Sequence, residues 1–211
     1  EALDYFDRTL SIYKELGNKN GEALNLLNIG RAISFKGDYE TALEYLNRSL
    51  AIFENFGSNN LAECLWITGY VYHSLGKYDK SLEHLERSLK LRENLGHNRA
   101  IKLSLISISI LYFDKTDYAK AQEAIKKAIA IKAPVGIATK LEINIFHNII
   151  NKHFGDEYDV STVNELAKRD DYIPFELNIR LYQLLEDEHY LETAHNQIQE
   201  MADNLEPDIK A

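Results

Sequence analysis

The chain of 211 residues repeats itself at intervals of about forty residues. The stretch GDYETALEYLNRSLAIFENFG at residues 37–57 and the stretch GKYDKSLEHLERSLKLRENLG at residues 76–96 are identical at eleven of twenty-one positions. A partial copy occupies residues 1–17, and a weaker copy occupies residues 116–136. Self-similarity at a fixed period of this length is typical of repeat architectures, in which each copy must stack on its neighbours to bury its apolar face.

Each copy is predicted to form two helices joined by a short turn. Apolar residues recur at helical spacing in residues 20–35 and again in residues 39–56, and Gly37 can close the first helix with a positive φ. Small residues recur where the two helices must approach closely, and a larger residue fills a shared core position. In successive copies the small residues are Gly30, Gly69 and Ser109, then Ala42, Ser81 and Ala121, then Ser49, Ser88 and Ala128, and the core position holds Leu46, Leu85 and Ile125.

The order of these positions resembles the tetratricopeptide repeat. An aromatic or aliphatic residue (Ile33, Tyr72 or Tyr112) follows the small residue of the first helix, and a G-x-Y turn precedes the small positions of the second. The period exceeds the usual length of about 34 residues and is similar to the long-helix subclass found in kinesin light chains and peptide-sensing bacterial regulators. The resemblance implies an all-α fold, a right-handed α-solenoid of stacked antiparallel helix pairs with a concave inner surface.

The resemblance divides the chain in two. Residues 1–136 are predicted to form the regular array, a partial first repeat followed by three helix-pair copies. Residues 137–211 depart from the motif and are expected to form divergent helical hairpins that cap the array. There, residues 137–155 read as a helix with Leu141, Ile145, Ile149 and Phe154 near one face, an abbreviated helix follows, and Pro174 stands near the start of a final hairpin.

Charge and composition argue against several classes of partner. The chain has 33 acidic and 24 basic residues, a net charge of −9, and lacks the basic stripe that nucleic-acid binders usually show. No apolar run approaches the ~20 residues of a membrane span. The single cysteine, Cys64, excludes an internal disulfide and is expected to be a buried small hydrophobe in a reducing compartment. We therefore expect a cytoplasmic protein that binds neither nucleic acid nor membrane.

No catalytic motif is apparent, so the sequence predicts a protein that is not an enzyme and that needs no cofactor or metal. Two E-x-x-H pairs, Glu186–His189 and Glu192–His195, have the spacing used in di-iron helical bundles. The first straddles a predicted turn, and the further ligands of such a site are missing. An enzyme or metal-binding protein built on this hairpin is therefore the least favoured interpretation.

The resemblance implies that a protein or peptide partner binds the first helix of each pair, which lines the concave groove. Inner-helix positions of the family map onto Leu27, Asn28, Arg31, Ser34 and Phe35, onto Glu63, Trp66, Tyr70 and His73, and onto Leu103, Ile106, Ile110 and Phe113. This set is unusually apolar, and Trp66 is the only tryptophan of the chain. Some relatives use residues of these helices to clamp a chaperone's C-terminal carboxylate. Most of those positions hold other residues here, namely Leu24, Ile67, Leu103 and Ser107, so we do not expect this chain to bind a chaperone's C-terminus.

Two hypotheses for the function follow. The favoured one is a non-catalytic module that binds a partner in the apolar groove. The other is a regulatory segment of a larger signalling enzyme of the protease or cyclase type, because the chain begins inside a repeat at Glu1. Asn28 either hydrogen-bonds an extended peptide backbone or simply faces solvent.

The N-terminal helix is expected to associate weakly with other molecules. Residues 1–16 read as a second helix without its first, in which Ala2, Phe6, Leu10 and Tyr13 form a stripe toward the next copy. Leu3 and Ile12 lie off that stripe, and exposed apolar residues of this kind favour self-association.

Overall fold

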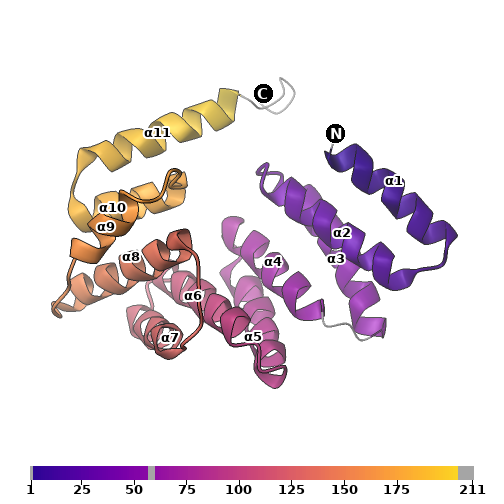
Figure 1. Cartoon of the computed structure of the whole chain (residues 1–211), viewed down its shortest axis with the longest axis horizontal. Helices are drawn as coiled ribbons and strands as arrows, with labels where there is room; N and C mark the ends of the chain where they lie inside the picture. The colour runs from indigo at the N-terminus through magenta and orange to yellow at the C-terminus, as the bar shows by residue number, and fades with distance from the viewer. Residues whose placement is uncertain (1, 57–59, 204–211) are drawn as a thin grey trace. The chain divides into compact units, whose positions relative to one another are not determined.

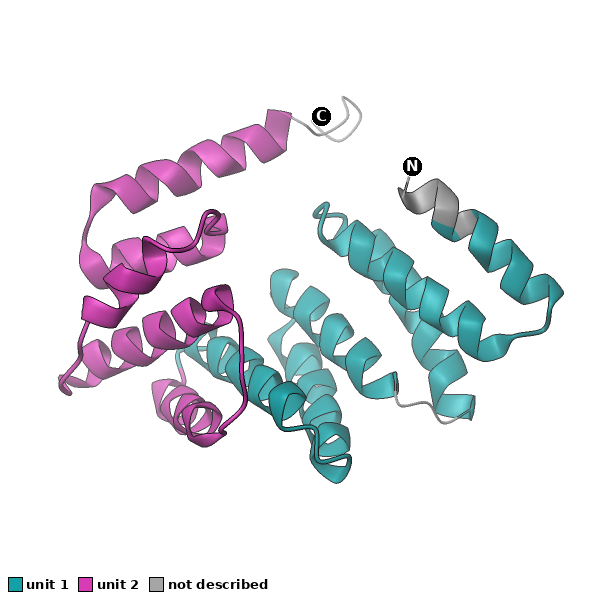
Figure 2. Ribbon diagram, in the orientation of Figure 1, with its two compact units in different colours: residues 1–116 teal, residues 117–211 magenta. Residues whose placement is uncertain are grey.

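The computed structural model describes residues 2–56 and 60–203, apart from the side chains of residues 2–5 and 7 (Figure 1). These residues form eleven α-helices and no strands, so the predicted all-α repeat fold is confirmed. The chain divides into two compact units, residues 1–116 and 117–211 (Figure 2). Unit 1 contains α1 (Ala2–Glu15), α2 (Lys19–Ser34), α3 (Tyr39–Phe56), α4 (Leu61–Ser74), α5 (Tyr78–Asn94) and α6 (Asn98–Asp114).

Unit 1 is built from antiparallel helix pairs in which each helix packs on the next. The pairs α2–α3 and α4–α5 make the most extensive contacts, and α1 on α2, α3 on α4 and α5 on α6 continue the series. The predicted small positions lie where the paired helices meet. A Cβ added to Gly30 would lie 2.8 Å from Leu46 Cγ, and one added to Gly69 would lie 2.8 Å from Leu85 Cγ. The repeated glycine therefore makes room for the repeated core leucine.

This close approach predicts that Gly69→Ala destabilises unit 1. The added methyl group would also lie 3.3 Å from the carbonyl oxygen of Ser81. Either Leu85 or the backbone of the paired helix α5 must therefore move to make room for it. We expect the free energy of unfolding to fall by ~1–2 kcal/mol, because overpacking outweighs the better helix propensity of alanine. Urea denaturation followed by circular dichroism measures the change.

Gly136→Ala is the matched control for that experiment. Gly136 has a φ of −66° and nothing within 4 Å of an added Cβ, so alanine there overpacks nothing. Because Gly136 is the N-cap residue of α8, we expect only the smaller loss in the free energy of unfolding that comes from a poorer N-cap. Equal midpoints for the two variants would contradict the role assigned to Gly69.

Buried serines join the two helices of the pairs α2–α3 and α4–α5. Ser49 Oγ donates to the carbonyl oxygen of Ala23 at 2.8 Å, and its counterpart Ser88 Oγ donates to that of Ala62 at 2.6 Å. Ser81 Oγ donates to the carbonyl oxygen of Gly69 at 2.7 Å. These hydroxyls need little space and have hydrogen-bond partners, which is the condition for burying a polar group without a large penalty.

The turns use a left-handed residue at regular intervals. Gly17, Gly37, Gly76 and Gly96 all have φ values between 65° and 85°, and Thr116 takes the same conformation with φ 61°. The predicted closing residue Gly57 lies outside the described residues. Gly136 is different, because α7 (Tyr118–Ala130) ends earlier and Gly136 instead precedes α8 (Ile137–Phe154) with negative φ.

Unit 2 continues the helical style with shorter elements. Besides α7 and α8 it contains α9 (Ser161–Ala167), α10 (Phe175–Leu185) and α11 (Glu188–Asp203). Helix α8 packs on α7, α9 and α10, and α10 packs on α11. Three of the predicted face residues of α8 are buried, whereas Phe154 is 46% exposed at the end of the helix. The final hairpin turns at residues 186–187, within the first E-x-x-H pair.

The loop after α8 is fixed by asparagines on that helix. Asn148 Oδ1 accepts a hydrogen bond from the Asp159 backbone N–H at 2.8 Å, and Asn151 Nδ2 donates to the Glu157 carbonyl oxygen at 3.4 Å. Both asparagines are buried. A regular repeat would have a long second helix at this point. Here the fixed loop is followed by the short helix α9 instead.

Helix α1 packs on α2 through the predicted stripe. Leu10 is buried, Phe6 and Tyr13 are half-buried, and the Tyr13 ring lies over Gly21 at the start of α2. Ile12 is 53% exposed, as expected for a residue off the stripe. The side chains of Ala2 and Leu3 lie outside the described residues. Self-association through α1 stays a prediction, as does the assignment of residues 137–211 as a cap.

Candidate partner-binding face

Helices α2, α4 and α6 occupy the first-helix position of three successive sequence copies, and α4 contacts both α2 and α6. We call their shared exposed surface the α2–α4–α6 face. It is made by the exposed or half-exposed side chains of Leu24, Asn28, Arg31, Phe35, Glu63, Trp66, Tyr70, His73, Leu103, Ser107, Ile110 and Phe113.

The structure sorts the predicted site residues by exposure. Phe35 is 74% exposed and Tyr70 is 38% exposed, and most of the others are half-buried. Leu27 and Ile106 are each only 1% exposed, and Ser34 is 4% exposed with its hydroxyl donating to the Arg31 carbonyl oxygen. These three side chains belong to the packing between helices. Leu24, which lies one turn before Asn28, is exposed and joins the face instead.

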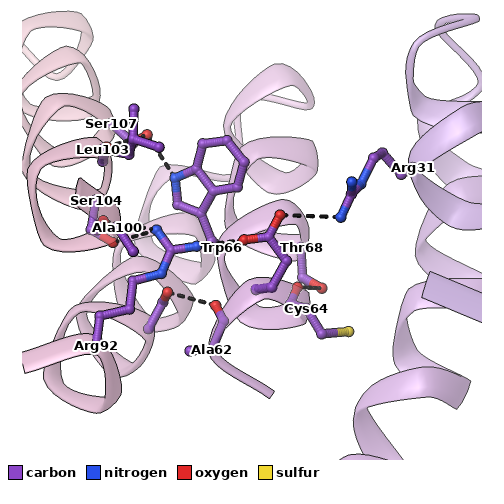
Figure 3. Close-up of polar contacts among 12 residues, drawn as sticks. Arg31, Ala62, Cys64, Trp66, Thr68, Arg92, Ala100, Leu103, Ser104 and Ser107 are labelled. Carbon is purple, nitrogen blue, oxygen red and sulfur yellow. Dashed lines mark hydrogen bonds and ion pairs between the residues drawn. The ribbon is translucent and has the colours of Figure 1, made fainter. Parts of the chain in front are cut away.

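A chain of charged side chains crosses this face from α2 to α6 (Figure 3). Glu63 on α4 uses both carboxylate oxygens. Its Oε1 accepts from Arg31 Nη2 on α2 at 3.1 Å, and its Oε2 accepts from Arg92 Nη2 on α5 at 2.7 Å. The Nη1 group of Arg92 donates to the Ala100 carbonyl oxygen at 3.0 Å and to Ser104 Oγ at 2.9 Å. One carboxylate and two guanidinium groups thus connect four helices.

The two arginines differ in their surroundings. The Arg92 side chain is 4% exposed, whereas those of Arg31 and Glu63 are 37% and 39% exposed. Burial lowers the pKa of Arg92, and the adjacent Glu63 carboxylate opposes that shift. Arg92 is therefore a buried cation whose counter-charge lies at the surface, while the contact between Arg31 and Glu63 is open to solvent and screened by it.

Trp66 is held between α4 and α6. Its Nε1–H donates to Ser107 Oγ at 2.9 Å, and the Arg92 guanidinium carbon lies 5.3 Å from the ring centroid. Figure 3 shows the indole ring on α4 with its nitrogen directed toward Ser107 and the Arg92 side chain beside it. The ring is half-buried, so it contributes to helix packing and still presents part of its surface to a partner.

A second polar contact joins the same two helices near their C-terminal ends. His73 Nε2 lies 2.8 Å from Asp114 Oδ2, and the His73 ring lies 5.6 Å from that of Tyr78. The predicted face residue His73 is therefore partly occupied by contacts within unit 1. The apolar part of the face near this contact comes from residues close in sequence to His73 or Asp114, namely Tyr70, Ile110 and Phe113.

Arg92 is the principal member of this site that the predicted set omits. It lies on α5, a second helix of a pair, whereas the resemblance directs attention to first helices. A signal for it does exist in the aligned copies. Arg92 occupies the position of Phe53, which is 1% exposed in the core of the preceding pair. The following copy has Lys132 at this position, but that side chain is exposed. A charged residue that is buried where the preceding copy has a core phenylalanine indicates a specific local interaction.

Cys64 is buried as predicted and has no exposed surface. Desolvation by burial raises the pKa of its thiol to about 12, and the thiol lies 3.7 Å from the Leu46 carbonyl oxygen. Because the thiolate is the reactive form, we expect Cys64 to be inert toward Ellman's reagent in the folded protein at neutral pH and to react rapidly in urea. Rapid reaction without denaturant would contradict the burial of this side chain.

Two kinds of site are not found among the described residues. Within residues 2–56 and 60–203, no group of three or more His, Cys, Asp or Glu side chains is placed to hold a metal ion. Glu186 of the first E-x-x-H pair lies in the turn before α11 and pairs with Lys152 at 2.8 Å. None of the helices in the same described ranges combines the length and apolar character that a membrane crossing requires.

A comparison of the sequence with known families identifies the family. A tetratricopeptide repeat family model matches residues 1–55 and 61–133, more than half of the chain. The chain therefore belongs to the tetratricopeptide repeat family. No curated protein sequence matches it in a sequence search.

Solved structures share the fold at low sequence identity. BtubC (BKLC) from P. vanneervenii is 16% identical with a TM-score of 0.69, over 82% of this chain and 75% of that one. A Podosopora anserina protein described as a kinesin light chain with TPR-like repeats is 15% identical to this chain. Its TM-score is 0.61, over 80% of this chain and 83% of that one. A Rap protein complexed with competence and sporulation factor is 17% identical with a TM-score of 0.69, and the match covers 95% of this chain but only 58% of the Rap chain.

Proposed function

We propose that unit 1 is an interaction module that binds a peptide or a segment of a partner protein on the α2–α4–α6 face. The observation that carries this proposal is the exposure of large apolar side chains on three adjacent first helices. Phe35 and Tyr70 are exposed, and Trp66, Ile110 and Phe113 are half-buried beside them. Exposed apolar surface that is concentrated on one face, with aromatic residues near its centre, is typical of protein interaction sites.

The comparisons support the same proposal. A Rap protein of similar fold was crystallised with competence and sporulation factor, so this fold accommodates a bound factor in at least one such structure. The polar groups of the face suit a peptide as well. Asn28 is half-exposed one turn from both Leu24 and Arg31, and its amide can both donate to and accept from a peptide backbone.

Selection from a phage-displayed library of random linear peptides tests the proposal without a known partner. We expect the folded chain to enrich a family of peptides with apolar residues. The best enriched peptide, made synthetically, should bind Phe35→Ala more weakly than the wild-type protein. Phe56→Ala is the matched control, since Phe56 is 65% exposed at the end of α3 and lies off the face. No enrichment, or equal loss in both variants, would contradict the proposal.

The regulatory alternative has one observation in its favour. The chain spans just over half the length of the Rap protein that it resembles, so proteins with this fold carry further residues. In that case the α2–α4–α6 face would bind an effector and thereby control an attached catalytic domain. Binding of the selected peptide to a longer natural chain, followed by a change in that chain's activity, distinguishes this function from a free-standing adaptor.

A further inference from the structure

Three residues of the middle copy that differ from the preceding copy meet at one place in unit 1. Where the neighbouring copies have Leu24 and Leu103, the middle copy has Glu63, and where they have Leu27 and Ile106, it has Trp66. Where the preceding copy has the buried Phe53 and the following copy the exposed Lys132, it has the buried Arg92. Arg92 follows Glu63 by 29 positions in the sequence and contacts both of the other two residues. Arg92 pairs with Glu63 at 2.7 Å and lies 5.3 Å from the Trp66 ring centroid. Relative to the preceding copy, the middle copy has an ion pair and a tryptophan in place of three apolar residues.

A buried ion pair is by itself weak evidence of a stabilising role. Replacing a buried ion pair by well-packed apolar residues is often neutral or stabilising, because the desolvation penalty of the charges is removed. The preceding copy shows that the same repeat position accepts a phenylalanine, since Phe53 is buried there with 1% exposure. A polar set in this position therefore calls for a reason other than packing.

Geometry supplies that reason. The Arg92 guanidinium is a planar fork, and it is held from one side by Ala100 and Ser104 of α6. Its other arm fixes Glu63 Oε2, and its cationic centre lies against the indole ring of Trp66. Glu63 and Trp66 are both partly exposed on the α2–α4–α6 face. Arg92 thus fixes from beneath the two side chains that a partner would touch.

We propose that Arg92 is a positioning residue, which makes the middle copy the centre of specificity by holding Glu63 and Trp66 in their binding orientation. The inference rests on the proposed function of the α2–α4–α6 face. The role belongs to a buried side chain on α5, the second helix of its pair. It acts through two residues on α4, the first helix of that pair.

The substitution Arg92→Phe, which installs the residue of the preceding copy, separates this role from stability. In this variant the Ser104 hydroxyl can donate to the Ala100 carbonyl oxygen one turn earlier, and the half-exposed Glu63 carboxylate can be hydrated. The former partners of Arg92 therefore need not be left without a hydrogen bond. We expect the urea midpoint to equal or exceed that of the wild-type protein. Because Trp66 is the only tryptophan, its fluorescence reports the site directly. Its emission maximum should change, and acrylamide should quench it more strongly.

Binding of the peptide selected on the wild-type protein completes the test. Arg92→Phe should weaken it about tenfold or more. The matched control Arg87→Phe, on the same helix but 45% exposed and paired with Glu54, should leave both the fluorescence and the affinity unchanged. Arg92→Lys keeps the cation without the fork and should give an intermediate loss of affinity at an unchanged urea midpoint.

The outcomes are distinguishable. Wild-type affinity and unchanged Trp66 fluorescence in Arg92→Phe would overturn the positioning role and leave the proposed function standing. If Arg92→Phe does not fold, Arg92→Lys decides the question: weaker binding by a stable variant supports the role, and unchanged binding overturns it. If the wild-type protein selects no peptide, the proposed function fails and the inference fails with it.

Discussion

Replacing Leu85 by alanine is expected to lower the free energy of unfolding by ~2–5 kcal/mol, the usual range for truncating a buried leucine. Leu85 is 1% exposed and packs against the backbone of Gly69 on the paired helix. The glycine has no side chain that could move into the space, and the equivalent pair in the preceding copy is built in the same way. The cavity should therefore remain largely open. Urea denaturation followed by the helical circular dichroism signal measures the loss.

Leu95→Ala is the control for this experiment. Leu95 ends the same helix but is 42% exposed, so its truncation removes little buried surface, and we expect a change of less than about 1 kcal/mol. If the two variants unfold at the same urea concentration, Leu85 does not occupy the core position that the repeat pattern assigns to it.

The second large effect concerns binding. Trp66→Ala should weaken the selected peptide by about 2 kcal/mol or more, as expected for a central aromatic anchor. The ring combines a half-buried surface, a hydrogen bond to Ser107 and a contact with Arg92, so it is well fixed before any partner arrives. Little conformational entropy is then lost on binding, which favours affinity. Isothermal titration calorimetry with the synthetic peptide gives the difference directly.

Stability measurements on the same variant separate binding from packing. Trp66→Ala should destabilise unit 1 less than Leu85→Ala does, because Leu85 is fully buried and Trp66 is not. Trp66→Phe keeps an aromatic ring and removes only the donor to Ser107, so most of the affinity should return. Destabilisation as large as that of Leu85→Ala would mean that the lost affinity follows from unfolding and that Trp66 is a packing residue.

The repeat pattern is sufficient to predict the helices and their close contacts. The second helix of the first full copy begins and ends where the pattern predicts, at Tyr39 and Phe56. Gly30 and Gly69 lie against the two core leucines, as their small size requires. These features depend on local periodicity and on steric limits between adjacent helices, and both are visible in a single sequence because it contains several copies to compare.

The binding face is less predictable, because periodicity locates a residue on its own helix but does not show how closely the next helix approaches. Leu24 and Leu27 lie one turn apart on α2, yet the first is 38% exposed and the second 1% exposed. The reach of long side chains adds a further difficulty. Arg92 starts on α5 and ends between α4 and α6, so its contribution to the face depends on three helices at once.

Helix α4 is linked to both α2 and α6 by side-chain contacts that bypass the intervening helices, and these contacts bear on how the stack responds to force. Arg31–Glu63, Trp66–Ser107 and His73–Asp114 each join residues 32 to 41 positions apart. All three contacts lie on the α2–α4–α6 face, so a force that pulls α2, α4 and α6 apart stretches all three. A load that presses the first helices together stretches none of them. Unit 1 is therefore expected to be an asymmetric spring, stiffer against spreading of its α2–α4–α6 face than against its compression.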